Sequence, residues 1–148
     1  TRWDSTALGD DCDYTINPMS YADNYDSTIT DNVTGLTWQK CSMGQSGADC
    51  ATGAATAYTW ADAGTACSNI GTGWRLPTRM ELISLVDYGV YNPTITGAYF
   101  PNTVSSYYWS STTYAGSTAR AWYVNFYSGI TVYYVKTDTK YVRCVRGQ

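Results

Sequence analysis

The sequence predicts an α+β domain in which two short helices pack against an antiparallel sheet. Two observations lead to this prediction. Helix-initiation signals occur at Thr59–Asp62 and at Thr78–Glu81, and apolar residues with helical spacing follow each of them. Beyond residue 106, apolar and aromatic residues alternate along segments bounded by turn residues, which is typical of strands. We therefore expect two helices followed by a sheet of three or four strands.

The first predicted strand spans Leu36–Lys40 and follows a turn at Asp31–Gly35. Its apolar residues Leu36 and Trp38 share one face, so we expect both to be buried. A first helix is predicted from about Trp60 to Asn69. The residues that share one face of this helix are Trp60, Ala63, Cys67 and Ile70.

The second helix has the clearest start in the chain. Thr78 and Glu81 form a capping box, in which each side chain satisfies a free backbone N–H of the first turn. The apolar face of this helix consists of Leu82, Leu85 and Val86, and Gly89 is expected to end it. Arg75 lies just before the helix. It either clamps loop carbonyls as a structural residue or binds a ligand.

The C-terminal segments predict the sheet. Trp122, Val124 and Phe126 alternate with polar or tyrosine residues, and Ser128-Gly129 occupies the position of a hairpin turn. On the last strand, Val142 and Cys144 are expected to face inward and Arg143 outward.

The chain has 148 residues, which fits one domain. We divide it into an extended N-terminal arm, residues 1–30, and a folded domain, residues 31–148. The arm is polar and aperiodic but too aromatic for a typical disordered tail. We therefore expect it to lie on a surface of its own or of a neighbouring subunit. The residues predicted to make subunit contacts are Trp3, Tyr14 and Ile16.

Five cysteines lack the spacing of a zinc site, so we expect disulfides, which indicate an oxidising compartment. Cys41 and Cys50 bracket a Gly/Ser loop and could close it. Cys67 and Cys144 could tie the middle of the chain to its end. Cys12 is left as a free thiol or as half of an intermolecular bridge.

Charge is distributed unevenly along the chain. Residues 1–50 carry eight aspartates against two basic residues, a net charge of −6, whereas residues 104–148 carry five basic residues against Asp138, a net charge of +4. These charges either neutralise each other within one subunit or bring the acidic head of one subunit to the basic tail of another.

Most enzyme classes are disfavoured by the composition. The chain has no histidine, which is the commonest general base, and its single glutamate, Glu81, already caps a helix. We expect no enzyme activity, no nucleic-acid partner and no cofactor. Calcium stays open as an alternative at Asp10, Asp11 and Asp13, although their spacing lacks a calcium-loop pattern.

We expect a secreted or cell-surface protein. No apolar run is long enough to span a membrane, and Thr1 in place of an initiator Met indicates a fragment or a processed chain that has lost a secretory signal. Asn32-Val33-Thr34 is a sequon, so Asn32 is a predicted glycosylation site.

Several ordered motifs carry a family resemblance. They are TGLTWQ (34–39), TWADA with the following Cys67, GWRLPTRMEL (73–82), YWSST (108–112), AWYVNFYSG (121–129) and VRCVRG (142–147). Together they resemble the Lcl C-terminal domain family. The resemblance implies a C-type-lectin-like fold related to formylglycine-generating enzymes, with a twisted sheet and a disulfide between the first helix and the last strand. It also implies an exported surface protein, and the adhesin that names the family binds sulfated glycosaminoglycans.

Two functions follow as hypotheses. The first is a non-enzymatic extracellular subunit of a filament, assembled with copies of itself through the N-terminal arm. The arm, the opposite charges of the two ends and the unpaired Cys12 favour it. The alternative is an adhesin or lectin-like module that binds carbohydrate through exposed aromatic rings. Those rings could instead have a purely structural role in covering the sheet. The predicted glycan contacts are Tyr107, Tyr108, Tyr123, Asn125 and Tyr127, and Trp109 is either exposed beside them or part of the core.

Overall fold

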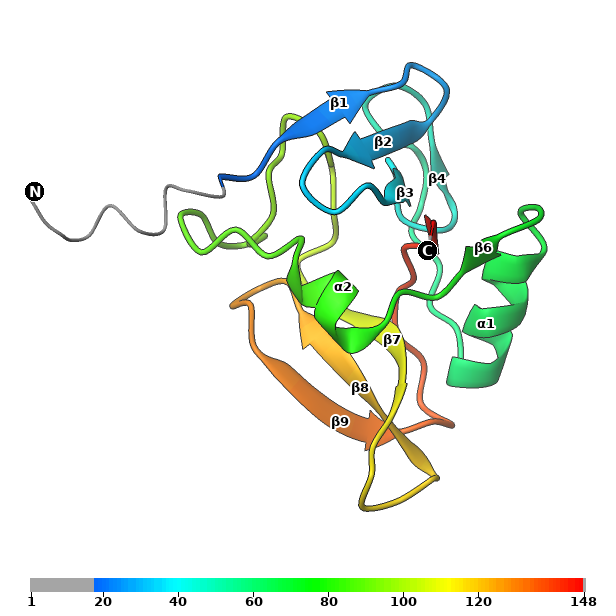
Figure 1. Ribbon diagram of the computed structural model, residues 1–148. Coiled ribbons are helices and arrows are strands. Elements are labelled where there is room, and N and C mark those ends of the chain that lie inside the picture. The colour runs from blue at the N-terminus through cyan, green and yellow to red at the C-terminus, as the bar shows by residue number, and fades with distance from the viewer. Residues whose placement is uncertain (1–17, 148) are drawn as a thin grey trace, which may run out of the picture.

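A computed structural model describes residues 18–147 of the chain (Figure 1). Its helices and strands are, in chain order, β1 (Tyr21–Asp23), β2 (Thr28–Asp31), β3 (Thr37–Gln39), β4 (Gln45–Ser46), β5 (Thr52–Gly53), α1 (Trp60–Ser68), β6 (Trp74–Arg75), α2 (Arg79–Ile83), β7 (Tyr107–Thr113), β8 (Arg120–Asn125), β9 (Thr131–Val135) and β10 (Val145–Arg146). No helix within the described range is long and apolar enough to cross a membrane.

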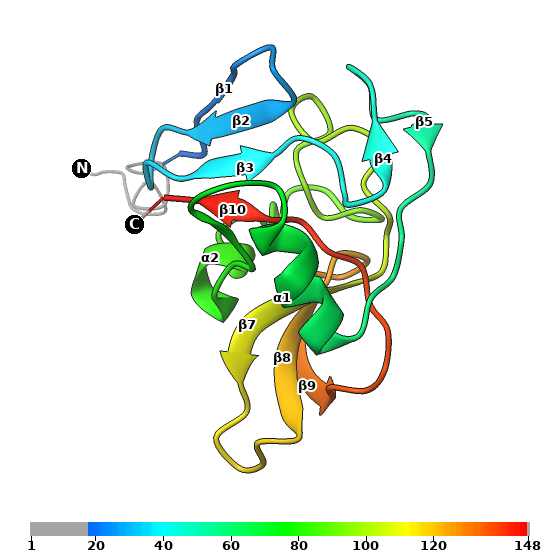
Figure 2. The ribbon, with the colours of Figure 1, turned by 90° about the vertical axis from the view of Figure 1, so that its right-hand side faces the viewer.

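The strands form two main antiparallel sheets and a small ribbon. One sheet has the order β1-β2-β3-β10-β6 and the other the order β7-β8-β9, while β4 and β5 form the ribbon. Helix α2 lies between the two main sheets in Figure 1, and α1 lies in front of β7 and β10 in Figure 2. The predicted α+β class is confirmed. The C-terminal sheet has three strands, because β10 joins the other sheet.

Two apolar clusters form the core, one on each side of β7. The larger cluster joins the five-stranded sheet to α2, and its largest buried side chains include Trp38, Leu82, Phe100, Tyr108 and Phe126. The smaller cluster packs beneath α1 and contains Ala63, Cys67, Trp109, Val142 and Cys144. Both helices therefore stabilise the same strand from opposite faces.

Both predicted helices are present, with different accuracy at their ends. Thr59 caps α1, and α1 ends within one residue of the predicted end. The capping box of Thr78 and Glu81 is present at α2, but this helix ends at Ile83 rather than near Gly89. The chain continues from Ser84 in tight turns with backbone bonds between residues three apart, such as Val86 N–H to Ile83 C=O. These turns still bury the predicted apolar residues Leu82, Leu85 and Val86.

The predicted division at residue 31 is wrong. Strands β1 and β2 form a hairpin that pairs with β3, so residues 21–30 belong to the folded domain. Tyr21 anchors this hairpin, because it is buried and its ring meets that of Phe100 edge-on at 5.2 Å. The predicted contact residues Trp3, Tyr14 and Ile16, and also Cys12, lie outside the described residues.

Arg143 faces inward, contrary to the prediction. Residues 142–145 are all buried, so this segment does not alternate as an edge strand would. The Arg143 guanidinium donates to the Gln39 carbonyl and to Thr103 Oγ1, each at 2.8 Å, and lies 5.0 Å from the ring of Phe100. Burial lowers the pKa of this guanidinium. Arg143 therefore contributes nothing to a basic outer surface.

Both expected disulfides are present. Cys41 and Cys50 close the loop that carries β4, with their Cα atoms 5.3 Å apart. Cys67 on α1 bonds to Cys144 directly before β10, with a Cα–Cα distance of 5.5 Å. The second bridge ties α1 to the five-stranded sheet.

Candidate functional site

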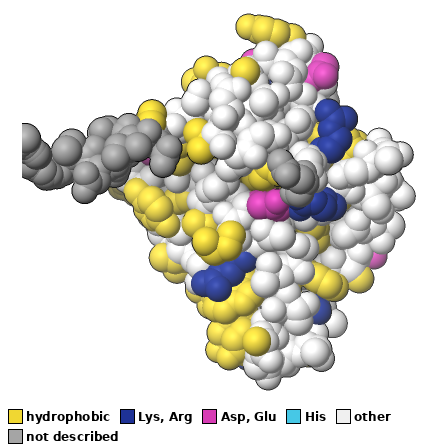
Figure 3. All heavy atoms as spheres, viewed as in Figure 1, with side chains coloured by type: hydrophobic (Ala, Val, Ile, Leu, Met, Phe, Trp, Pro, Cys, Tyr) yellow, Lys and Arg dark blue, Asp and Glu magenta, His cyan; other side chains and the backbone are white. Residues whose placement is uncertain are grey.

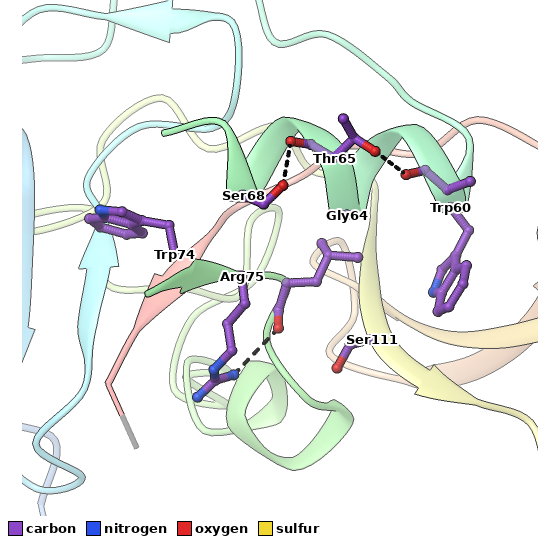
Figure 4. A pocket seen from close by; sticks show the side chains of 9 residues that line it. Trp60, Gly64, Thr65, Ser68, Trp74, Arg75 and Ser111 are labelled. Atoms are coloured by element: carbon purple, nitrogen blue, oxygen red, sulfur yellow. Dashed lines mark hydrogen bonds between the residues drawn. The ribbon is translucent and has the colours of Figure 1, made fainter. Parts of the chain in front are cut away.

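A groove with a volume of about 450 Å³ lies between α1, β6 and β7. Figure 4 shows the indole rings of Trp60 and Trp74 at its two ends. Gly64 lies on the helical wall, and Arg75 and Ser111 lie across from the helix. The groove therefore combines apolar surface with a few polar groups, as small-molecule sites do.

Trp60 is held firmly at one end of the groove. It begins α1 directly after the cap residue Thr59, and its Nε1 donates to the Ser110 carbonyl at 2.9 Å. Lys136 Nζ lies 3.9 Å from the centre of the indole ring and donates to Thr113 Oγ1 at 3.0 Å. The indole is therefore a fixed surface.

Gly64 leaves open space in the middle of the groove. A Cβ atom added there would meet nothing within 4 Å, so the fold itself does not require a glycine at this position. Glycine inside a helix costs roughly 0.5–1 kcal/mol relative to alanine. Glycine at this position therefore makes the helix less stable than alanine would, and it leaves the groove open.

Arg75 forms a two-pronged ion pair with Glu81. Its Nη1 and Nη2 donate to the two carboxylate oxygens at 2.7 and 2.9 Å. This contact lowers the pKa of Glu81 and raises that of Arg75. Arg75 Nη1 also reaches the Leu76 carbonyl and Nη2 the Gly147 carbonyl, each at 3.4 Å. These bonds agree with the structural-clamp interpretation, and Glu81 both caps α2 and neutralises the guanidinium.

Two of the predicted glycan contacts lie together on the three-stranded sheet. The rings of Tyr107 and Tyr123 are 4.9 Å apart, and Tyr134 of β9 joins them around Lys140. The Lys140 ammonium lies 4.7, 4.5 and 4.6 Å from the centres of the Tyr107, Tyr123 and Tyr134 rings, and 3.2 Å from Asp138. We call Tyr107, Tyr123, Tyr134 and Lys140 the tyrosine cluster.

The other predicted contacts do not join this cluster, and Tyr108 is a correction. Its side chain is fully buried, and its hydroxyl lies 2.6 Å from Ser42 Oγ, so it cannot stack on a sugar. Trp109 is likewise fully buried and belongs to the core. Tyr127 pairs edge-on with Tyr91 at 6.1 Å, and Asn125 Oδ1 accepts the Tyr127 N–H within the hairpin.

Sequence reasoning missed three residues that shape these sites. Ser111 is one of several polar residues in the YWSST motif, and Lys140 lies between predicted strands, so no sequence signal distinguishes either of them as a site residue. Gly64 offers one signal, because a glycine interrupts an otherwise good helical pattern.

The sequence comparison settles the family. The family model described as the Lcl C-terminal domain matches residues 27–146, most of the chain. The chain belongs to the Lcl C-terminal domain family. The match runs from β2 to β10, so β1 precedes the matched Lcl domain. A comparison with curated proteins finds no match.

Of the remaining predicted site residues of this Lcl domain, the structure describes Asn32 but not the three aspartates considered for calcium. Asn32 is exposed in the turn after β2, and its side-chain amide donates to Ser20 Oγ at 3.1 Å. Asp10, Asp11 and Asp13, the residues considered for calcium, lie outside the described range. Within residues 18–147, no three His, Cys, Asp or Glu side chains are placed to hold a metal ion.

The Lcl domain also exposes a strand edge and apolar side chains. Among the described strands, β9 pairs with β8 alone. Large hydrophobic side chains are exposed on the loop before residue 92 and on the β8–β9 turn, namely Tyr88, Tyr91, Tyr127 and Ile130. Hydrophobic side chains also gather on the left of the surface in Figure 3, the side on which the β8–β9 turn lies in Figure 1.

Proposed function

We propose that this protein is a non-enzymatic subunit of an extracellular surface filament. The N-terminal segment, residues 1–17, of one copy would add a strand to the β9 edge of the next copy. The free β9 edge is the observation that carries the proposal. We also infer that the domain has the C-type-lectin-like architecture that its family membership implies.

The hydrogen-bond pattern of β9 supports this role. Asn125 N–H donates to the Ile130 carbonyl, and Lys136 N–H donates to the Ala119 carbonyl. Because bonded pairs alternate in an antiparallel ladder, the intervening residues direct their backbone groups away from β8. These outward-facing residues are Thr131, Tyr133 and Val135.

The side chains of β9 do not protect this edge. The strand reads Thr-Val-Tyr-Tyr-Val, without a charge or a proline, and Val132, Tyr134 and Val135 are exposed. Soluble proteins usually block such edges with lysine, proline or a bulge. An extended segment from a neighbouring copy would supply the missing backbone bonds.

The N-terminal segment has a suitable composition for the donor. Tyr14, Thr15 and Ile16 favour extended structure, and they precede β1 by a short stretch. A contact between the N-terminal segment of one copy and the β9 edge of the next joins two different surfaces, and repeating such a contact without ring closure generates a filament. The two disulfides support an oxidising, extracellular location.

Electron microscopy and light scattering of the full chain test this proposal. We expect filaments for the parent protein and for Val135→Thr, which keeps the backbone N–H. We expect none for Val135→Pro, which lacks it, or for a chain without residues 1–17. A parent protein that stays monomeric, or filaments that persist in both altered chains, would refute the role of this segment and edge.

A carbohydrate-binding adhesin is the second candidate. The partly exposed tyrosine cluster favours it, because two of its rings were predicted as sugar contacts and Lys140 holds them together. Binding of the chain to a glycan array, lost in Tyr107→Ala and kept in Tyr127→Ala, would support this role.

A further inference from the structure

We propose that the groove between α1, β6 and β7 binds a neutral sugar unit of an oligosaccharide. This site is separate from the β9 edge and from the tyrosine cluster. It is therefore an additional sugar site, which neither proposed function requires.

The cations near the groove are already engaged, since Lys136 and Arg146 lie 3.9 and 5.1 Å from the indole rings of Trp60 and Trp74. We therefore expect the groove to favour a neutral ligand. Arg75 is the charged side chain among the residues that line it, and both of its terminal nitrogens donate to Glu81. A sulfated or phosphorylated ligand would have to compete with this carboxylate, and sites for such anions use clustered basic residues. A ligand that carries hydroxyls and no charge meets no such cost.

The polar groups of the groove are suited to hydroxyls. The Ser111 hydroxyl makes no hydrogen bond within the described residues, so it can both donate and accept. The hydroxyls of Thr65 and Ser68 donate to carbonyls of their own helix at 3.2 and 3.0 Å, which leaves their lone pairs to accept from a ligand (Figure 4).

The apolar surface of the groove suits the C–H face of a sugar ring. The indole of Trp60 is immobilised by its hydrogen bond to Ser110 and by Lys136. Little side-chain entropy is therefore lost when a ligand packs on it. Leu76 also lines the groove, and Gly64 leaves room on the helical wall. The volume of about 450 Å³ falls within the range of sites that hold small ligands.

The substitution Gly64→Leu tests the proposal without weakening the helix. Leucine is a better helix former than glycine, and its Cβ meets nothing of the chain itself, so the side chain would fill the groove. Gly97→Leu is the matched control, because a Cβ there also meets nothing within 4 Å and Gly97 lies outside the groove. Ser111→Ala removes the unpartnered hydroxyl.

The probes are neutral cello-, xylo- and manno-hexaoses and a sulfated heparin hexasaccharide, titrated into the full chain by calorimetry. We expect at least one neutral hexaose to bind, and to bind more tightly than the sulfated one. Gly64→Leu should weaken its binding at least tenfold, Ser111→Ala about three- to tenfold, and Gly97→Leu less than twofold. The proposal is overturned if no neutral hexaose binds, if the sulfated probe binds more tightly, or if Gly64→Leu binds as well as the parent. Binding lost in Tyr107→Ala but kept in Gly64→Leu would likewise overturn it.

Discussion

Removing the Cys67–Cys144 disulfide should cost far more stability than removing Cys41–Cys50. The first bridge joins residues 77 apart in sequence and the second joins residues 9 apart. In the chain-entropy model, the corresponding stabilisations are about 4.5 and about 2.6 kcal/mol. Cys67 and Cys144 are also fully buried, so replacing them with alanine adds a packing loss to the entropic one.

The two double variants, Cys67→Ala/Cys144→Ala and Cys41→Ala/Cys50→Ala, are compared by guanidinium denaturation with tryptophan fluorescence. Both are made in a Cys12→Ser background, because a free thiol can exchange with a disulfide. A domain of this size has a free energy of unfolding of roughly 5–15 kcal/mol, so the first variant should be marginal at 25 °C and the second should remain folded. Equal losses, or a larger loss for the short loop, would refute the assignment of the long bridge as the main covalent constraint.

Three further predictions concern charged side chains. Arg143→Met leaves buried main-chain carbonyls without donors, so urea denaturation should show a loss of at least about 2 kcal/mol, and a smaller loss would contradict the proposed role. Lys140→Met should lower the free energy of unfolding by about 1–2 kcal/mol in the same measurement, because the variant lacks the ammonium that the tyrosine rings surround. The bond from Arg75 lowers the pKa of Glu81 from 4.5. The ion pair therefore stabilises the fold fully above the pKa of Glu81 in the unfolded chain, and this stabilisation is lost as the pH falls through the lower pKa of the folded state. The melting temperature should drop on acidification below about pH 4.5. Glu81→Gln should make that drop smaller.

The helix starts could be predicted because their signals are local. Thr78 and Glu81 satisfy each other's backbone groups within four residues, and no distant contact is needed to recognise this. The β1–β2 hairpin had no comparable signal. Its turn places Tyr25 and Ser27 at φ values of 58° and 73°, where glycine or asparagine is the usual residue. A turn built from such residues reads as irregular chain, so the predicted domain began too late.

The candidate sites were harder to predict, because their residues meet only through the fold. The groove combines a helix, the short strand β6 and Ser111 from β7. The tyrosine cluster depends on Lys140, which lies outside the sheet in sequence. For the tyrosine cluster, sequence reasoning identified Tyr107 and Tyr123 but not Lys140, and for the groove it considered Arg75 alone as a ligand contact.

The error at Tyr108 has a physical cause that also indicates where ligands can bind. Alternation assumes one covered face, but β7 is covered by α2 on one side and by α1 on the other. Tyr108 packs in the first core cluster and Trp109 in the second, so neighbouring residues are buried on opposite faces. The exposed tyrosines of this sheet lie at the first residue of β7, Tyr107, and on β9, Tyr134. These residues belong to the free β9 edge and the tyrosine cluster, so partner recognition there is compatible with a core packed on both sides of β7.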